Sequence, residues 1–342
     1  MVSLKSPLQI VLFGSPGTGK SHYVKTEILP SLAIEPSGDN CIPTVFHPEY
    51  SYGDFMGKLL PLSAGGKVEY QYYAGHFLKA LARAYRNILV ETETQKQGNV
   101  ALVIDEINRG NSAAIFGTAF QLLDRDARGW STYEVDISDM EFAALLRSMG
   151  AEIEPIYREG GVLRETRYVF NGKSYTERTI GELLEPLGMR ANQIRIPPNL
   201  SLIATMNTSD NSIYYMDTAF KRRWDWQYID NDSSRIGVEG IAFNNRDEWA
   251  AFIYGLNQFI RRSNRYVRKV EDKLIGHWFI SDEQITKSQI QNKVMFYLWD
   301  SVFVTNRQPL AELLDVSSSE LVTFGDFAKL VDSIIGKLRT KR

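Results

Sequence analysis

Cysteine and histidine are scarce in this sequence. Its 342 residues include one cysteine, Cys41, and four scattered histidines that show no metal-ligand spacing. A single thiol forms no internal disulfide, and by itself it builds no thiolate metal site. A disulfide framework is therefore excluded, and no cysteine- or histidine-based metal site is expected.

Long apolar runs and an excess of charge of one sign are also missing. No apolar run approaches the ~20 residues that a membrane helix needs, and the N-terminus has no signal-peptide cleavage pattern. With 39 Lys and Arg against 41 Asp and Glu, the formal net charge is −2. This balance excludes nucleic-acid binding through overall charge, although local basic patches stay possible. We expect a soluble chain without a membrane partner in a reducing, cytoplasmic setting.

The composition is that of a globular protein. Hydrophobic residues make up 44% of the chain and charged residues 23%, which argues against a mainly disordered chain. At roughly 100–200 residues per domain, the length predicts one large domain or two smaller ones.

A phosphate-binding loop is the strongest motif. Residues 8–13 (LQIVLF) form an apolar run typical of a strand, and a helix-competent segment follows the motif. Glycines let backbone N–H groups turn inward around phosphate oxygens, while the next helix directs its positive end there. Lys20 would reach the β- and γ-phosphates, and the Ser21 hydroxyl would bind Mg²⁺. The predicted nucleotide-binding residues are Gly14, Ser15, Pro16, Gly17, Thr18, Gly19, Lys20 and Ser21.

Acidic residues end a second buried run, 100–104 (VALVI). Asp105 would hold Mg²⁺ through water, and Glu106 would orient or deprotonate the attacking water. Seen alone, such a pair could also be two solvated acids at a strand end. The phosphate-binding loop upstream favours the catalytic interpretation.

Two further polar elements follow in order. A third buried run, 202–206 (LIATM), ends in Asn207, whose amide could contact the γ-phosphate or the attacking water. Arg222 and Arg223 lie just past a short expected helix, where an arginine could be offered to a neighbouring subunit's nucleotide. The alternative for the arginines is a solvated basic turn. Their order and spacing after Asn207 favour the catalytic role.

With these elements in order, the sequence resembles the AAA+ family and, within it, the McrB-type motor subunits of restriction systems. The additional matching stretches are 46–55 (FHPEYSYGDF) with Pro61, 105–111 (DEINRGN) with 115–117, 206–210 (MNTSD), 217–224 (DTAFKRRW) and 275–279 (IGHWF). Together the matches span residues 8–280, and their combination is more specific than a phosphate-binding loop alone.

The resemblance implies an α/β fold, with a parallel sheet sandwiched by helices and a C-terminal helical lid. It implies an NTPase ring, with six subunits and active sites at subunit interfaces, in which turnover drives DNA translocation for a separate McrC-like nuclease subunit. Mg²⁺ is the implied cofactor. GTP is favoured over ATP as substrate, and this preference rests on the resemblance alone. Asn207 is implied as a sensor and Arg222 or Arg223 as the trans-acting arginine, with Asn108 a further candidate for positioning water.

Two alternative functions remain open. A MoxR-like ATP-dependent protein-remodelling ATPase would share the loop, the acidic pair and the arginines without acting on DNA. A nucleotide-gated scaffold would bind nucleotide and barely hydrolyse it, although the intact Glu106 argues against this.

The sequence also departs from the family pattern. Asn211 stands where the family has an arginine, and the stretch 130–193 is longer than the expected link. The first strand begins within ten residues of the N-terminus, so the DNA-reading domain that commonly precedes this motor is expected to be missing. Either the sequence is a trimmed form, or it is a short form whose DNA specificity lies on another subunit.

We expect a nucleotide-binding core at 1–229, with an insertion at about 130–193, and a helical lid at 230–342. Apolar periodicity predicts helices over 75–90, 111–123, 136–149, 249–262, 290–303 and 324–338. Asn171-Gly172 predicts a hairpin with a type I′ turn between 164–170 and 173–176. Arg261, Arg262, Arg265, Arg268 and Lys269 cluster near one helix end, where they would contact DNA or a partner's acids, or form a solvated face.

Overall fold

The computed structural model describes residues 7–64, 67–91, 98–158, 163–207, 214, 216–230 and 238–339. The chain divides into two compact units, Met1–Trp224 and Asp225–Arg342, and each is described by itself. The segment 208–211, which carries part of one family-like motif, lies outside the described residues.

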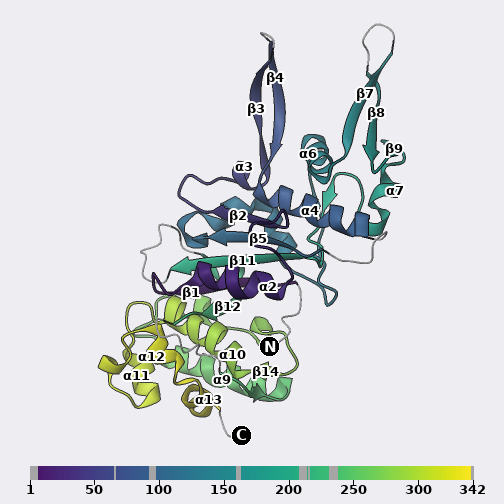
Figure 1. The fold of residues 1–342 in the computed structure, drawn as a ribbon. Helices are drawn as coiled ribbons and strands as arrows, with labels where there is room; N and C mark the ends of the chain where they lie inside the picture. The colour runs from purple at the N-terminus through teal and green to yellow at the C-terminus, as the bar shows by residue number, and fades with distance from the viewer. Residues whose placement is uncertain are drawn as a thin grey trace. The chain divides into compact units, whose positions relative to one another are not determined.

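A parallel sheet forms the centre of the first unit (Figure 1). Its strands in this unit run in the order β1 (Gln9–Gly14), β11 (Leu200–Asn207), β5 (Val100–Asp105) and β2 (Cys41–Val45). The three apolar runs predicted from the sequence are the three adjacent strands β1, β11 and β5. Such near-continuous apolar runs are typical of parallel strands buried on both faces. The α/β fold class expected from the sequence is confirmed.

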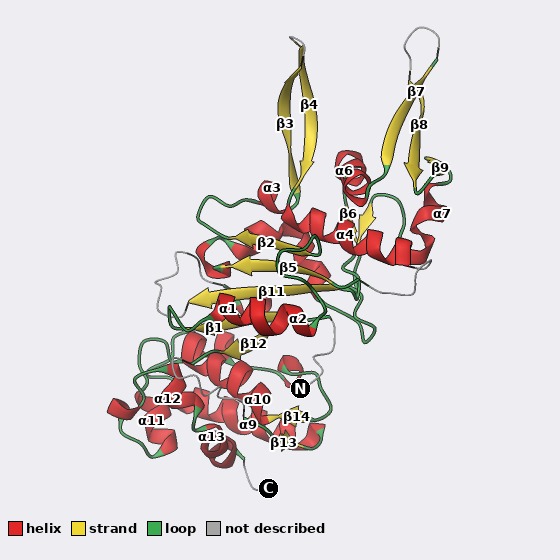
Figure 2. Cartoon of the chain, in the orientation of Figure 1, coloured by secondary structure: helices red, strands yellow, loops and turns green. Residues whose placement is uncertain are grey.

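Helices cover the sheet (Figure 2). The phosphate-binding loop leads into a continuous helical segment made of α1 (Lys20–Tyr23), the π-helical η1 (Val24–Ile28) and α2 (Leu29–Ser31). Helix α4 (His76–Glu91) packs against β5 and β2. Its predicted apolar stripe is buried at Phe77, Leu81, Ala84 and Tyr85, and it is half-buried at Ile88.

The expected helix over 111–123 is interrupted. It is α5 (Ser112–Phe116) followed by the 3₁₀ segment η3 (Gly117–Leu123). Gly117 adopts φ +50°, and a Cβ at this position would lie 2.9 Å from the Tyr52 ring. The tertiary contact with Tyr52 therefore overrides the helical periodicity of the sequence at Gly117.

Two antiparallel ribbons project from the first unit (Figure 1). One pairs β3 (Gly57–Ala64) with β4 (Lys67–Ala74), and the other pairs β7 (Glu152–Tyr157) with β8 (Leu163–Phe170), which in turn pairs with β9 (Lys173–Thr176). Asn171 and Gly172 have φ of +48° and +75°. Two consecutive residues with positive φ are what a type I′ turn requires, so the predicted β8–β9 hairpin is confirmed.

The first ribbon is anchored tightly at its base. A Cβ on Gly75 would lie 2.3 Å from the Phe55 carbonyl oxygen, and a Cβ on Gly57 would lie 2.4 Å from the Tyr72 ring. Only glycine fits at these two positions, because neither neighbour leaves room for a side chain. Gly57 therefore lies close to the neighbouring strand β4, and Gly75 lies close to Phe55 at the end of α3.

Helix α6 (Asp139–Met149) begins where the sequence predicts a cap. Ser138 and Glu141 form a capping box, in which each side chain accepts from the other residue's backbone N–H. The remaining elements of this unit are short: α3 (Tyr52–Phe55), η2 (Ile107–Arg109), β6 (Val135–Asp136), α7 (Ile180–Leu184), η4 (Glu185–Leu187), β10 (Gln193–Ile194) and α8 (Thr218–Lys221).

The second unit is mostly helical. Its longest helix is α9 (Arg246–Arg262), and the predicted helix over 324–338 divides into α12 (Phe324–Ala328) and α13 (Val331–Leu338). The predicted helix over 290–303 is largely the π-helical segments η7 (Ile290–Met295) and η8 (Leu298–Val302). The other elements are β12 (Asp225–Tyr228), β13 (Ile241–Phe243), η5 (Val270–Lys273), η6 (His277–Phe279), β14 (Ile285–Thr286), α10 (Lys287–Gln289), α11 (Gln308–Leu314) and η9 (Ser318–Glu320).

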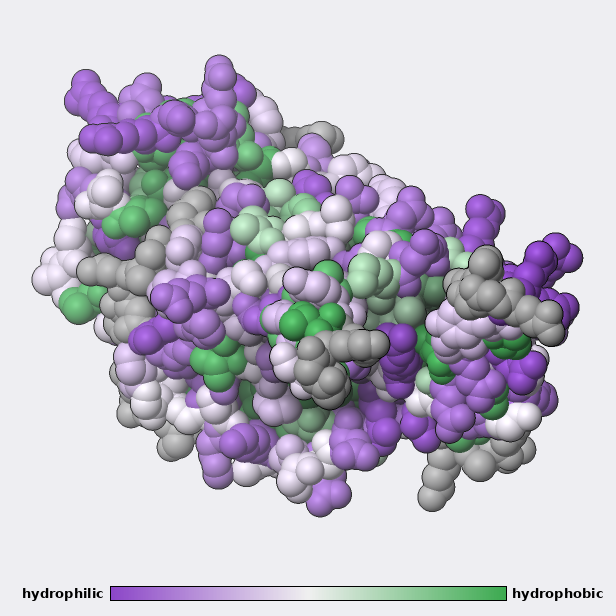
Figure 3. Space-filling view, turned by 90° about the horizontal axis from the view of Figure 1, so that it is seen from above, coloured by the Kyte–Doolittle hydropathy of each residue, from purple (hydrophilic) through white to green (hydrophobic). Residues whose placement is uncertain are grey.

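The surface seen in Figure 3 is mostly hydrophilic, and its hydrophobic residues gather in small separate patches. Among the helices of the described residues, none has the length and apolar character needed to cross a membrane.

Candidate active site

The loop between β1 and α1 has the backbone shape that its glycines predict. Gly17 and Gly19 adopt φ of +79° and +80°, and a Cβ built on either would meet nothing within 4 Å. Thr18 Oγ1 donates to the Ser15 carbonyl oxygen at 3.1 Å and closes the loop on itself. Left-handed glycines beside open space form a cradle in which backbone N–H groups can approach phosphate oxygens.

Lys20 is held inside this loop. Its side chain is buried, and Nζ donates to the carbonyl oxygens of Gly14 at 3.1 Å and Ser15 at 2.8 Å. A buried ammonium needs such acceptors, because burial without partners is costly. The charge is therefore fixed at the loop, where the sequence predicts that a nucleotide's phosphates bind.

The carboxyl ends of three strands bring the predicted metal-binding residues together. Ser21 Oγ donates to Asp105 Oδ1 at 3.2 Å, and Thr205 Oγ1 donates to the same oxygen at 2.9 Å. Thr205 was not identified from the sequence. Its signal was a hydroxyl inside the apolar run of β11, three per cent exposed, where a buried polar side chain requires a partner.

Glu106 and Asn207 meet at the same edge of the sheet. Asn207 Nδ2 donates to Glu106 Oε1 at 2.7 Å, and Asn108 Nδ2 donates to the Asn207 carbonyl oxygen at 3.2 Å. Arg109 Nε lies 3.5 Å from Glu106 Oε2. Glu106 itself adopts φ +55°, an uncommon conformation for a residue with a side chain and one that clusters at functional sites.

The oxygen donors at this edge suit Mg²⁺. The Ser21 hydroxyl and an Asp105 carboxylate oxygen lie 3.2 Å apart, and both are the hard ligands that Mg²⁺ prefers. Within the described residues, no group of three or more His, Cys, Asp or Glu side chains could hold a metal.

The two neighbouring arginines have different environments. Arg223 Nη2 lies 2.7 Å from Asp124 Oδ2, Nη1 donates to the Ala219 carbonyl oxygen at 3.0 Å, and the guanidinium stacks on the Phe120 ring at 4.0 Å. Arg222, in contrast, is exposed to solvent. Arg223 is committed to contacts within its own subunit, whereas the Arg222 side chain is accessible from outside.

A partly buried hydrogen-bond network fixes the segment that carries these arginines. Gln9 Nε2 donates to the Arg223 carbonyl oxygen at 2.6 Å and to that of Leu123 at 2.8 Å. Gln9 Oε1 accepts from Arg125 Nε at 3.0 Å. Burial lowers the pKa of the Arg125 guanidinium, and its Nη2 donates to the Leu200 carbonyl oxygen at 2.9 Å. None of Gln9, Asp124 and Arg125 was identified from the sequence.

The family-like stretch 46–55 has a packing role. Phe46 stacks on Tyr50 with ring centroids 4.8 Å apart, and Phe55 lies 4.6 Å from Phe116 on α5. Burial raises the pKa of the Tyr50 hydroxyl to about 12, and this hydroxyl lies 2.8 Å from His76 Nδ1. This aromatic cluster supports the residues that follow β5.

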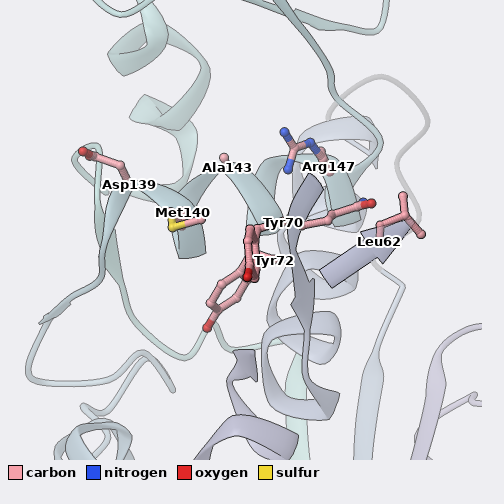
Figure 4. Close-up of a pocket in the computed structure, with 8 residues that line it drawn as sticks. Leu62, Tyr70, Tyr72, Asp139, Met140, Ala143 and Arg147 are labelled. Atoms are coloured by element: carbon pink, nitrogen blue, oxygen red, sulfur yellow. The ribbon is translucent and has the colours of Figure 1, made fainter. Parts of the chain in front are cut away.

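A separate hollow of about 460 Å³ lies between β4 and α6 (Figure 4). Tyr70 and Tyr72 on the ribbon face Met140 and Ala143 on the helix, and Tyr72 donates to Glu141 at 3.2 Å just beside it. None of the residues that line it belongs to the predicted active site.

Comparisons with known proteins identify the family of the chain. The sequence model of the AAA domain (dynein-related subfamily) matches residues 9–224. Component YdiS of the type II restriction enzyme BsuMI from Bacillus subtilis (strain 168) is 28% identical over 342 aligned residues, which cover 92% of this chain and 85% of that protein. The EcoKMcrB subunit of a type IV methyl-directed restriction enzyme from Escherichia coli (strain K12) is 24% identical over 272 residues, which cover 79% of this chain.

That alignment covers 45% of the Escherichia coli protein. A cryo-EM reconstruction of Hsp104 with FITC-casein matches with a TM-score of 0.28 and 12% identity over 96% of this chain and 42% of that one; nothing follows for this chain from so low a score. The expected resemblance to McrB-type AAA+ proteins is confirmed, and these relatives do not favour the MoxR-like alternative.

Proposed function

Because this chain belongs to the AAA domain family (dynein-related subfamily), we propose that it is the nucleoside-triphosphate-hydrolysing motor of a restriction system. GTP is its preferred substrate over ATP, and six subunits form the ring. The observation that carries the proposal is the linked set of side chains at the carboxyl ends of β1, β5 and β11. There, Ser21 bonds to Asp105, and Asn207 bonds to Glu106.

Each residue of this set has a chemical role in hydrolysis. The loop glycines and Lys20 bind the phosphates, while Ser21 and Asp105 hold Mg²⁺, which when bound neutralises charge on the phosphate oxygens. Glu106 accepts a proton from the attacking water, and Asn207 keeps the Glu106 carboxylate oriented through its 2.7 Å bond. Arg109 Nε lies 3.5 Å from Glu106 Oε2 and forms an ion pair with this carboxylate.

Arg222 acts in trans and Arg223 does not. A trans-acting arginine has to reach a neighbouring subunit's nucleotide, so its guanidinium cannot be held by contacts within its own subunit. Arg223 is bound to Asp124 and stacked on Phe120, and it positions α8 and the start of the following segment. The exposed Arg222 is the side chain available to a neighbour.

The motor drives DNA translocation for a separate McrC-like nuclease subunit. Support comes from the two restriction-enzyme relatives, one of which is a component and the other a subunit of a larger enzyme. The preference for GTP rests on the family resemblance. Within the AAA+ sheet, the end of β11 faces the γ-phosphate, so the base is selected elsewhere.

Solution mass, measured by light scattering with non-hydrolysable GTP and ATP analogues in parallel, tests the proposal. We expect a particle of about 230 kDa, six times the 38.9 kDa subunit, with the GTP analogue. Assembly with the ATP analogue alone would overturn the GTP preference. A chain that stays monomeric with both analogues would overturn the ring.

A further inference from the structure

A dense group of cations lies at the end of α9 in the second unit. Within the ten residues 261–270 there are five cations and no acid, although the whole chain carries a net charge of −2. All five side chains are exposed. We refer to them as the basic patch: Arg261, Arg262, Arg265, Arg268 and Lys269.

The backbone that carries the basic patch is a loop held in place by buried side chains and local hydrogen bonds. Ser263 and Val267 are buried at 7% and 5% exposure, so they anchor the loop between its exposed cations. Ser263 Oγ donates to the Phe259 carbonyl oxygen at 2.9 Å, and the Tyr266 N–H donates to the Ser263 carbonyl oxygen at 2.9 Å. These buried side chains and local hydrogen bonds hold the cations together on one exposed segment.

The far end of the loop is tied back to the same helix. Asn257 Nδ2 donates to the Ile275 carbonyl oxygen at 2.8 Å, and the Ile275 N–H donates to Asn257 Oδ1 at 3.0 Å. These two bonds close residues 258–274 into a loop. The backbone that carries the cations is therefore ordered before a ligand binds, which lowers the entropic cost of binding.

The cations of the basic patch differ from others in the same unit. Arg339 pairs with Glu248, Lys287 with Asp332 and Lys293 with Asp225. Arg246 donates to three carbonyl oxygens, and Arg307 donates to two. Among the residues that the structure describes, no ion pair within 4 Å engages a cation of the basic patch. Two exposed acids, Glu271 and Asp272, follow the patch without pairing with it.

The residue types of the basic patch indicate what kind of ligand it binds. Four of the five cations are arginines, whose planar guanidinium binds phosphate through two parallel hydrogen bonds. The other exposed side chains of the segment are Asn264 and the 39% exposed Tyr266, both polar. No aliphatic side chain is exposed there, as a protein interface core or a membrane-bound segment would require. From this arrangement we infer that the basic patch binds the phosphate backbone of a nucleic-acid duplex.

One further side chain extends this surface along α9. Tyr254, 61% exposed, precedes Arg261 by seven residues, which is two helical turns, so the two share a face. Tyrosine hydroxyls are common donors to phosphate and sugar oxygens. The inferred surface thus continues from the loop along the helix. Contacts of this kind position a duplex without reading its sequence.

The inference gives the proposed motor a direct contact with its DNA, but its test needs neither nucleotide nor turnover. Fluorescence anisotropy of the full chain without nucleotide measures binding to a labelled DNA duplex over a range of salt concentrations. We expect an affinity that falls with salt, with a log–log slope near about −4.5 if all five cations bind phosphates. Duplex RNA of equal length distinguishes the two sources of backbone phosphate.

The decisive variant carries Arg261→Gln, Arg265→Gln and Arg268→Gln. It should bind duplex DNA at least about 10-fold more weakly at ~0.1 M salt, with a salt slope shallower by about 3. The matched control carries Lys173→Gln, Arg178→Gln and Arg190→Gln, which removes the same charge from exposed positions of the first unit. The control should bind like the unmodified chain.

Three outcomes would overturn the inference. These are no duplex binding at low salt, equal losses in the patch variant and the control, and binding to poly-glutamate as tight as to duplex, which would indicate an acidic protein partner. Circular dichroism confirms that the variants fold. NTP hydrolysis without DNA, measured separately, reports on the proposed function, so failure of one does not imply failure of the other.

Discussion

The candidate active-site edge of the sheet and the basic patch of the second unit use charge in opposite ways. At the sheet edge, Asp105, Glu106 and Asn207 bond to one another or to their neighbours. In the basic patch, the cations are exposed and unpaired within the described residues. The first arrangement suits catalysis, which needs reactive groups held in a fixed geometry. The second suits binding to a repeating polyanion, where each contact adds to the others.

The difference predicts how each region responds to substitution. An interlocked site should fail when one member changes, because each residue holds another in place. A set of independent cations should lose affinity in steps. The following experiments test that contrast, beginning with the largest expected effect.

Arg222→Ala should lower NTP hydrolysis by about 10³- to 10⁵-fold, because a trans-acting arginine stabilises charge that develops in the transition state. Phosphate release measures this loss. Mixing with Lys20→Ala subunits should restore part of the activity, since they lack their own phosphate-binding lysine and still supply Arg222. Full activity of Arg222→Ala alone, or no rescue on mixing, would contradict the assignment.

Glu106→Gln should lower hydrolysis by about 10²- to 10⁴-fold, because the amide cannot accept a proton from water. Nucleotide affinity, measured with a fluorescent analogue, should stay close to that of the unmodified chain, and the variant should accumulate as a nucleotide-bound ring. Lys20→Ala is the matched comparison, since it should lose binding itself. Unchanged turnover in Glu106→Gln would refute the role of this residue.

Arg223→Ala should act on stability more than on chemistry. The side chain is 11% exposed and pairs with Asp124, which is 37% exposed, so we expect a loss of about 1–3 kcal/mol in the free energy of unfolding. Urea denaturation measures it, with the exposed Arg222→Ala as a control near zero. An unfolding free energy equal for the two variants would show that Arg223 is not the structural member.

Arg265→Gln alone should produce the smallest change. We expect the salt slope of duplex binding to become shallower by about 1, with little effect on NTP hydrolysis. Anisotropy titrations at several salt concentrations measure the slope. If this single change abolished binding altogether, the basic patch would be an interlocked site like the sheet edge, and the contrast between the two regions would fail.

Much of the fold was predictable because its signals are local. The apolar runs that became β1, β5 and β11 are continuous and end in motif residues. The Asn171-Gly172 pair is also a local signal, because both residue types accept the positive φ angles that they adopt here. The ribbon of β3 and β4 was missed. Its strands lack clean alternation, and Pro61 within β3 argues against a strand, yet a two-stranded ribbon has free edges that accept it.

In the candidate site, the motifs predicted residue types and the fold supplied their partners. Thr205 and Asp124 belong to no motif, and each forms a hydrogen bond with a residue about 100 positions away in the sequence. The Thr205 contact depends on strand order, which puts β11 beside β5. The distinction between Arg222 and Arg223 likewise required the Asp124 carboxylate, so sequence alone left it open.

The tight base of the β3–β4 ribbon has a mechanical consequence. A Cβ on Gly57 would meet the Tyr72 ring of the neighbouring strand, and one on Gly75 would meet the Phe55 backbone, so the base of the ribbon has no room for a side chain at either position. Eight residues at ~3.3 Å each give a lever of about 26 Å, so a tilt of about 10° at the base sweeps the tip through about 5 Å. Any tilt at this base would therefore produce a larger displacement at the far end of the ribbon.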